Sequence, residues 1–472
     1  MSAAISFRDP AGFCVGLDSH ILRVVEPGHV AALEAFLNSP CGRKFATDGI
    51  LISARLLAKA EVVQWLNHPE FKQALAGRPV GAVFEHERID FPSFPHEWSP
   101  EMLRAAGELT LDLAVEALKA GYQLKDAAPS NILFRGAKPV FVDVLSFEPR
   151  TPGQTIWTAY AQFVRTFLLP LLADKYWRTS LAEIFTTHRD GLEPEELYAR
   201  CTWFQKLRPP FLTMVTLPKL LGGEGAAVGP ASKTEDEKAL FVIEALLKRL
   251  RCTLAKLRTN PRKGSGWSRY METHSYDANA FSAKEAFVRT ALSEFKPQKL
   301  LDVGANTGHF SRLAAGLGAQ VVAIDSDAAC VGECFARARR ENLDILPLVV
   351  DIARPTPSLG WRNGECASFL DRARGHFDAV LMLALVHHLL VTERVPLNEI
   401  IDLAAELTKS LLIIEFVPFE DPMFQRLLRG RDALFGNYNR EFFERSCECR
   451  FEIVRSADIP GTARRLYLLR KR

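Results

Sequence analysis

The last part of the chain alternates compact apolar runs with longer segments in which apolar residues recur at helical spacing. The apolar runs are KLLDVG, AQVVAID, ILPLVVD, FDAVLMLAL and SLLIIEFV. Because these runs are apolar on both faces, they are typical of parallel strands that helices cover on each side. The pattern therefore predicts an α/β domain with a mostly parallel sheet over residues 282–472.

The first half also alternates short strand-like runs with longer helical ones, up to about residue 221. The segment GGEGAAVGPASKTED at 222–236 then breaks the periodicity with glycine, proline and serine, which is typical of a linker. From 237 to 259 apolar residues return at the spacing of an amphipathic helix. We therefore expect a first domain over 1–221, a linker and helical connector over 222–281, and a second domain over 282–472.

Composition agrees with a globular protein of more than one domain. The chain has 472 residues, 48% of them hydrophobic, and a formal net charge of +3. Neither its start nor its apolar runs give a hydrophobic stretch as long as a signal-peptide core or a membrane span. The 9 cysteines are scattered without paired Cys-x-x-Cys spacing, as expected of reduced thiols. We therefore expect a cytoplasmic protein without a membrane span, and composition leaves its oligomeric state open.

The turn after the run KLLDVG carries the first candidate chemistry. Asp302 lies in the run, Gly304 lets the backbone turn sharply beside a ligand, and Gly308 lets the next helix pack closely on the strand. Asn306 stands where a third glycine is often found, and asparagine tolerates a left-handed backbone. The next run ends in Asp325, whose carboxylate can accept two hydrogen bonds from ribose hydroxyls.

A third run ends in Asp351, followed by Ile352, which suits the edge and face of an adenine. Together these segments resemble the class I S-adenosylmethionine-dependent methyltransferases. The resemblance implies a Rossmann-like domain with a mostly parallel seven-stranded sheet and no metal. It also implies that Asp302 and Gly304 lie beside the methionine part of the cofactor, Asp325 binds the ribose, and Asp351 with Ile352 frames the adenine. An NAD-type domain is disfavoured because the tight G-x-G-x-x-G turn is absent.

The fourth run leads into His387 and His388, at the sheet edge where open α/β folds bind ligands. An imidazole that titrates near neutrality can take a proton from a hydroxyl or an amine, so His388 is the first candidate base. Alternatively, the histidines cap the helix expected at LLVTERVPLNEI or line the cofactor. Glu415 ends the fifth run and is a second candidate for orienting the acceptor or the base; its alternative is a capping or solvated carboxylate.

The first half carries a second candidate site in LKDAAPSNILFRGAKPVFVDVLSFE at 124–148. Its Asp126, Asn131 and Asp143 resemble the catalytic loop and metal-binding aspartate of the protein-kinase-like and aminoglycoside-phosphotransferase-like folds. The resemblance implies a kinase-like α+β domain in which Asp126 orients the acceptor while Asn131 and Asp143 hold magnesium on ATP. However, Leu124 replaces the usual histidine, and no glycine-rich loop or strand lysine can be identified. An active atypical kinase, a kinase-shaped substrate-binding module and a coincidental loop all remain open.

A basic stretch at 247–263, LKRLRCTLAKLRTNPRK, contains no acid. It suits an RNA backbone, an anionic glycan or a phospholipid surface, or it is a solvated helix face. The segment GWSRYMETHSYDANAF at 266–281 gathers aromatic residues that either cover the cofactor or pack between the domains.

Taken whole, the chain resembles a bacterial family, the NoeA-like nodulation methyltransferases. We therefore predict a methyltransferase that acts on a small molecule or glycan. The alternatives are an RNA methyltransferase that uses the basic stretch, a cofactor-sensing pseudoenzyme that binds a protein partner, and a bifunctional kinase–methyltransferase.

Overall fold

The computed structural model describes residues 4–17, 19–221, 235–258, 278–428, 430 and 435–472. Its contacts divide the chain into two compact units, which are described separately. The first unit comprises residues 1–135, 139–260 and 359–366, and the second comprises 136–138, 261–358 and 367–472. The linker expected at 222–236 lies almost wholly outside the described residues, and so do the aromatic Trp267, Tyr270, His274 and Tyr276. The expected domain boundaries stay a prediction.

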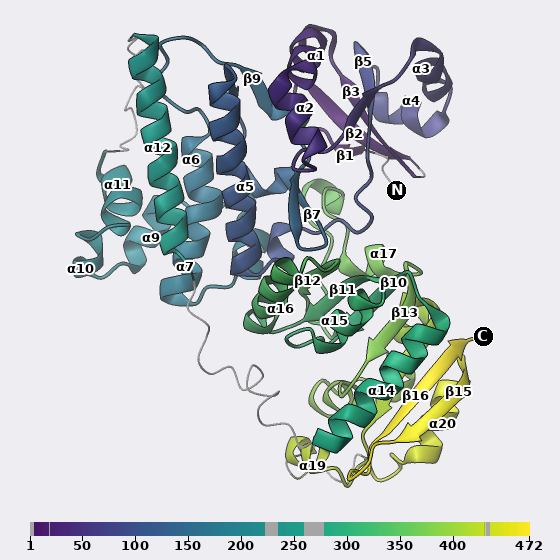
Figure 1. Ribbon diagram of the computed structural model, residues 1–472. Coiled ribbons are helices and arrows are strands. Elements are labelled where there is room, and N and C mark those ends of the chain that lie inside the picture. The colour runs from purple at the N-terminus through teal and green to yellow at the C-terminus, as the bar shows by residue number, and fades with distance from the viewer. Residues whose placement is uncertain (1–3, 18, 222–234, 259–277, 429, 431–434) are drawn as a thin grey trace. The chain divides into compact units, whose positions relative to one another are not determined.

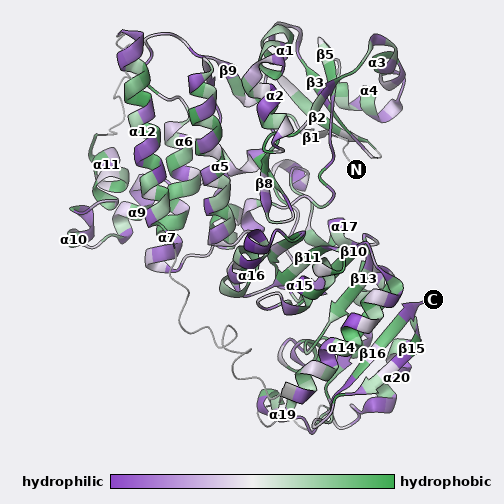
Figure 2. Ribbon diagram, in the orientation of Figure 1, coloured by the Kyte–Doolittle hydropathy of each residue, from purple (hydrophilic) through white to green (hydrophobic). Residues whose placement is uncertain are grey.

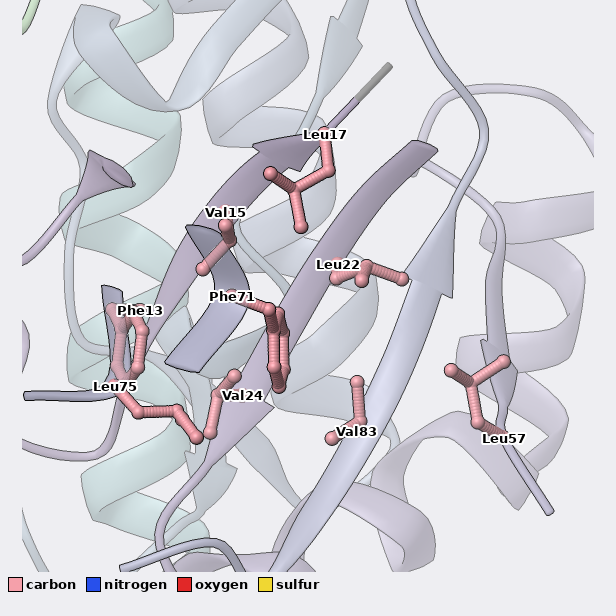
Figure 3. Packing of buried hydrophobic residues seen from close by; sticks show 9 residues of the cluster. All are labelled: Phe13, Val15, Leu17, Leu22, Val24, Leu57, Phe71, Leu75 and Val83. Atoms are coloured by element: carbon pink, nitrogen blue, oxygen red, sulfur yellow. The ribbon is translucent and has the colours of Figure 1, made fainter. Parts of the chain in front are cut away.

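The first unit begins with an antiparallel five-stranded sheet (Figure 1) of order β1-β2-β3-β5-β4. Its strands are β1 (Ala4–Ser6), β2 (Gly12–Leu17), β3 (His20–Val25), β4 (Ala54–Leu56) and β5 (Ala82–His86). Helices α1 (Val30–Asn38) and α2 (Pro40–Thr47) precede β4, and α3 (Lys59–Leu66) and α4 (Pro69–Leu75) follow it. Alternate residues of β2 and β3 share one face, and this face packs on α4. Figure 3 shows the resulting core of Phe13, Val15, Leu17, Leu22, Val24, Leu57, Phe71, Leu75 and Val83.

A helical region follows the sheet, beginning with α5 (Pro100–Lys119). The Ser99 hydroxyl accepts a hydrogen bond from the Met102 amide at 3.3 Å and so caps this helix. Two short two-stranded sheets come next, one of β6 (Tyr122–Leu124) with β9 (Phe147–Pro149) and one of β7 (Ile132–Arg135) with β8 (Lys138–Phe141). The remaining helices are α6 (Tyr160–Phe163), α7 (Leu169–Trp177), α8 (Leu181–Thr187), α9 (Pro194–Arg200), α10 (Trp203–Lys206), α11 (Leu217–Leu221) and α12 (Asp236–Lys256). A sheet followed by helices is the α+β arrangement expected of a kinase-like domain.

Helix α12 confirms the amphipathic helix predicted from residue 237 onward. Its buried residues recur at helical spacing and face α5: Ala239, Ile243, Leu247, Leu250 and Leu254. A Cβ at Gly107 of α5 would lie 3.2 Å from the Leu254 side chain. Glycine at this position therefore lets the two helices approach closely.

The second unit is built on a seven-stranded sheet of order β12-β11-β10-β13-β14-β16-β15. The strands are β10 (Lys299–Val303), β11 (Gln320–Asp325), β12 (Ile345–Val349), β13 (Phe377–Met382), β14 (Thr408–Phe416), β15 (Phe451–Asp458) and β16 (Arg465–Lys471). β10 to β14 pair in parallel, and β16 pairs antiparallel with both β14 and β15. The chain order reverses between β10 and β13, which creates a crevice at the carboxyl ends of these strands. The predicted mostly parallel, Rossmann-like sheet is confirmed.

Helices accompany this sheet (Figure 2), whose strands are predominantly hydrophobic. They are α14 (Ala278–Phe295), α15 (His309–Gly316), α16 (Ala328–Glu341), α17 (Phe369–Ala373), α18 (Leu397–Leu407), α19 (Pro422–Leu428) and α20 (Arg440–Glu448). The expected continuous helix at LLVTERVPLNEI is wrong: His388–Thr392 form a π-helical turn, and α18 begins only after Pro396. Pro396 has no amide hydrogen to donate to the preceding turn, so the π-helical turn and α18 are separate segments. Among the described helices, none is long and apolar enough to span a bilayer.

Candidate functional site

The loop between β10 and α15 forms the centre of the candidate site. Gly304, Asn306 and Gly308 have φ angles of 74°, 51° and 80°, so all three adopt the left-handed backbone that their residue types tolerate. The amides of Gly304 and Ala305 donate to the Ile324 carbonyl at 2.9 and 3.0 Å. These bonds fold the loop back over the end of β11.

Gly308 has a different packing role from the predicted one. A Cβ at this position would lie 2.4 Å from the Cys334 sulfur on α16. The close approach that glycine permits is therefore between the start of α15 and α16, rather than between the helix and its own strand.

Asp302 lies near the end of β10, with only 3% of its surface exposed. Its carboxylate accepts a hydrogen bond from the Ser311 hydroxyl at 2.6 Å. Burial raises the pKa of this carboxyl to about 6, and the nearby charge of Asp325 also raises it, while Ser311 and the charge of Lys284 lower it.

Asp325 ends β11 and is held by backbone groups. Its two carboxylate oxygens accept hydrogen bonds from the Asn306 amide at 2.8 Å and the Asp327 amide at 2.9 Å. Burial is the largest cause that raises the pKa of this carboxyl. Asp325 therefore fastens the loop at Asn306 to the end of the neighbouring strand.

Asp351 follows β12, and its carboxylate accepts the Ala353 amide at 3.0 Å. It also forms an ion pair with Arg354 at 2.7 Å. Arg354 pairs in turn with Glu393 at 2.7 Å, which links the loop after β12 to the segment after β13. Ile352 is buried beside these residues in the sequence. The ends of β10, β11 and β12 are adjacent in the sheet, so the structure brings the predicted cofactor residues to one edge.

His387 and His388 follow β13 at the same edge. The two rings lie 4.1 Å apart between centroids. His387 is fully buried, and neither ring nitrogen has a hydrogen-bond partner among the described residues. Burial lowers the pKa of His387 well below its usual value, and burial together with the charge of Arg464 lowers that of His388 to about 4. Both imidazoles are therefore neutral at pH 7.

Glu415 is fully buried at the end of β14. One carboxylate oxygen accepts from the Lys284 ammonium at 2.6 Å and from the Ala384 amide at 3.0 Å. The other accepts from Arg464 at 3.2 Å, and Arg464 also binds both oxygens of Asp421, at 2.6 and 2.9 Å. Glu415 thus ties α14, the loop after β13 and the loop before β16 together.

The first unit brings Asp126, Asn131 and Asp143 into one cluster. Asp143 pairs with Arg23 of β3 at 2.8 Å and accepts a hydrogen bond from the Ser146 hydroxyl, to which the Asn131 amide donates at 3.5 Å. Asp126 accepts the Ala128 amide at 3.1 Å, and burial followed by the charge of Asp143 raises its pKa.

Arg23 is buried and has further partners, since its guanidinium donates to His86 at 3.0 Å and to the Val142 carbonyl at 3.3 Å. His86 donates to the Ser53 carbonyl at 2.9 Å through its other ring nitrogen, and burial lowers its pKa to about 4. A strand cation therefore does accompany the cluster, although it is an arginine and already holds Asp143. Across the described part of the chain, no group of three His, Cys, Asp or Glu side chains could hold a metal ion.

Comparison with known proteins adds the family. Residues 301–404 match the model of a methyltransferase domain. Nodulation protein NoeA from Rhizobium meliloti (strain 1021) is 31% identical over 471 residues, which cover 98% of this chain and 94% of NoeA. This chain belongs to the NoeA family. Its second unit is an S-adenosylmethionine-dependent methyltransferase with a class I fold.

Solved structures with some similarity include the N-methyltransferase NodS from Bradyrhizobium japonicum WM9. It is 15% identical, with 41% of this chain and 98% of NodS covered and a TM-score of 0.31. Another is the bifunctional kinase-methyltransferase WbdD, which is 19% identical, with 43% of this chain and 42% of WbdD covered and a TM-score of 0.28.

Sequence reasoning missed three functional neighbours in this NoeA-family chain: Arg23, Lys284 and Arg464. Lys284 left a signal, because it interrupts the apolar stripe of α14 that runs through Ala280, Val288 and Leu292. Arg23 likewise lies inside the apolar strand HILRVV. Arg464 lies in a loop and left no such signal.

Proposed function

We propose that the second unit transfers a methyl group from S-adenosylmethionine to a small-molecule or glycan acceptor at the carboxyl edge of β10 to β14. The observation that carries this proposal is the succession of Asp302, Asp325 and Asp351 at the ends of three adjacent parallel strands, beside a left-handed loop. Such an edge is where open α/β sheets bind their ligands.

The carboxylates fit the parts of the cofactor in chain order. Asp302 and Gly304 would lie beside its methionine part, Asp325 would accept the ribose hydroxyls, and Asp351 with Ile352 would frame the adenine. Asn306 and Gly308 hold the turn that makes this approach close. The methionine part of the cofactor carries a cationic ammonium group. Its charge would favour the ionised form of the Asp302 carboxylate, which burial disfavours.

When bound, the cofactor supplies a methyl group on a positively charged sulfur. Transfer then depends chiefly on alignment and on exclusion of water. His388 is the proposed base, and its pKa of about 4 limits it to accepting a hydrogen bond or a proton from an acceptor that becomes acidic during transfer. His387 would position the acceptor through its two ring nitrogens, which have no partner among the described residues. Glu415 acts as a positioning residue, since its carboxylate is already bound to Lys284, Arg464 and the Ala384 amide.

The test uses full-length protein with methyl-labelled S-adenosylmethionine and bacterial extract, followed by separation of RNA, protein, glycan and small-molecule fractions. Label is expected in the small-molecule or glycan fraction. Asp325→Ala should abolish it, whereas Asp190→Ala removes a carboxylate with a 79% exposed side chain and should leave it unchanged.

Two other outcomes would contradict the proposal. RNase-sensitive label would favour RNA as the acceptor and make the basic stretch its binding surface. Within that stretch Arg251 is already paired with Asp112, whereas Lys248 and Arg249 are exposed. Cofactor binding without label in any fraction would instead favour a cofactor-sensing pseudoenzyme.

The first unit has a second candidate function, a Mg-ATP site at Asp126, Asn131 and Asp143. The Arg23–Asp143 ion pair favours the kinase-shaped binding module over the active kinase, because the aspartate that would hold magnesium already has a cation. A bifunctional enzyme would bind ATP only with magnesium, and Asp143→Ala would abolish that binding. If calorimetry detects no magnesium-dependent binding of ATP, the first unit is a kinase-shaped binding module that does not transfer phosphoryl groups.

A further inference from the structure

One surface of the first unit exposes large apolar side chains that the methyltransferase site does not use. It lies on α10 and α11, which Figure 1 shows together at one edge of the helical region. The α10–α11 surface consists of Trp203, Phe204, Leu207, Leu217, Leu220 and Leu221. Leu220 and Leu221 are 66% and 72% exposed, and Trp203 is 63% exposed. Exposed apolar residues that gather in one place mark an interaction site, whereas scattered ones do not.

The charged residues of the segment that carries this surface have one sign. Residues 201–221 contain Lys206, Arg208 and Lys219 but no aspartate or glutamate. On the neighbouring α9, Glu196 pairs with His188 at 3.6 Å, and Glu193 just before the helix pairs with Arg165 at 2.7 Å. Glu193 therefore has a cationic partner outside the surface, whereas Glu195 of α9 is exposed.

The described end of the basic stretch lies close to the same surface. Phe211, between α10 and α11, packs on Tyr176 of α7 with ring centroids 4.9 Å apart. The adjacent Lys175 donates a hydrogen bond to the Lys256 carbonyl at 2.7 Å, near the end of α12. Lys256 and Arg258 are exposed there, and Tyr176 is itself partly exposed. Cations thus border the apolar side chains on the α12 side as well.

We propose that the α10–α11 surface binds this protein to the surface of an anionic phospholipid bilayer. Tryptophan, phenylalanine and leucine flanked by lysine and arginine are the side chains that enter the boundary between headgroups and acyl chains. The cations complement anionic headgroups at the same time. A second copy of the chain fits less well, because two such surfaces facing each other would bring the like charges of Lys206, Arg208 and Lys219 from both copies into one contact. RNA would match the cations but leave the leucines without an apolar partner.

Co-sedimentation of the full-length protein with vesicles tests the proposal. Vesicles of phosphatidylcholine with phosphatidylglycerol should bind the protein, and vesicles of phosphatidylcholine alone should bind it much more weakly. Trp203→Ala should weaken binding by about tenfold or more, since a large apolar side chain no longer leaves water. Trp361→Ala is the matched control, because Trp361 is 64% exposed but lies outside the surface.

Charge reversal tests the contribution of the cations to binding. Arg208→Glu with Lys219→Glu should reduce binding to the anionic vesicles further, whereas the fluorescence of the buried Trp98 and Trp157 should stay unchanged and report correct folding of the first unit. Three results would overturn the proposal: no binding to vesicles of either composition, equal binding of Trp203→Ala and Trp361→Ala, or a dimer in solution that Trp203→Ala dissociates. The last result would assign the surface to a second copy of the chain.

Discussion

Asp143 of the first unit is held differently from Asp302 and Asp325 of the second unit, whereas Asp351 of the second unit has its own cation in Arg354. In the first unit Asp143 lies 2.8 Å from Arg23, so the chain supplies the counter-charge itself. In the second unit Asp302 accepts from a hydroxyl and Asp325 accepts from backbone amides. Neutral donors satisfy the hydrogen bonds but leave a charge that burial disfavours, and the pKa of each carboxyl rises. Asp143 therefore already has a counter-charge, whereas a cationic or hydrogen-bonding ligand would favour the ionised forms of Asp302 and Asp325.

The second unit contains both arrangements side by side. Glu415 is bound by Lys284 and Arg464, and it holds backbone segments together. The neighbouring His387 is equally buried but has no partner for its nitrogens in the described structure. Ion pairs thus hold the backbone segments of this edge together, whereas the ring nitrogens of His387 stay without a partner among the described residues.

The largest expected effect tests the ion pairs of Glu415 with Lys284 and Arg464. Glu415→Ala leaves Lys284 and Arg464 buried without their shared partner, so the free energy of unfolding should fall by about 3–5 kcal/mol. Urea unfolding followed by circular dichroism measures this loss. Glu406→Ala removes an exposed partner of Arg374 and should cost less than about 1 kcal/mol. If both variants lose a similar free energy of unfolding, the buried ion pairs of Glu415 do not stabilise the protein more than an exposed one.

The next effect tests whether the first cluster is closed by its own charges. Arg23→Met leaves Asp143 without its buried cation, and the free energy of unfolding should fall by about 3 kcal/mol. Adding Asp143→Asn removes the uncompensated charge and should restore much of that loss. Fluorescence of the buried Trp98 and Trp157 reports unfolding of this unit. If the double variant is no more stable than Arg23→Met, the two side chains are not coupled.

Much of the second unit could be predicted because its signals are local. A buried strand, a glycine turn and an aspartate at the next strand end all lie close together in sequence, and parallel pairing brings the strand ends to one edge. The ion pairs could not be predicted in this way. Lys284 and Arg464 reach Glu415 from distant segments, and Arg23 reaches Asp143 from another hairpin. A charged residue in an apolar stripe shows that a partner must exist, but only the fold shows which one.

A smaller effect concerns Asp325, whose carboxylate accepts hydrogen bonds from backbone amides. Asp325→Ala removes the acceptor proposed for the ribose hydroxyls and also frees the Asn306 amide. The affinity for S-adenosylmethionine should fall by about 1.5–3 kcal/mol, or roughly tenfold to a hundredfold, as measured by calorimetry. Asp143→Ala, in the closed cluster, should leave this affinity unchanged. If Asp325→Ala and Asp143→Ala lose the same affinity for S-adenosylmethionine, Asp325 does not bind the cofactor in the way proposed.

The smallest effect is a pH dependence of cofactor binding that comes from Asp302. Without cofactor its pKa is raised to about 6, so the carboxyl becomes increasingly protonated below that pH. A cationic ammonium beside it favours the ionised form, and binding must then displace the proton. The affinity should therefore be constant above about pH 7 and fall by up to about tenfold for each pH unit below 6. Calorimetry between pH 5 and 8, in about the range where this carboxyl titrates, measures the slope, and Asp302→Asn should bind more weakly with a flatter profile. If the cofactor affinity of Asp302→Asn depends on pH as steeply as that of the wild-type protein, another group titrates. Cofactor binding then does not require the ionised carboxylate of Asp302.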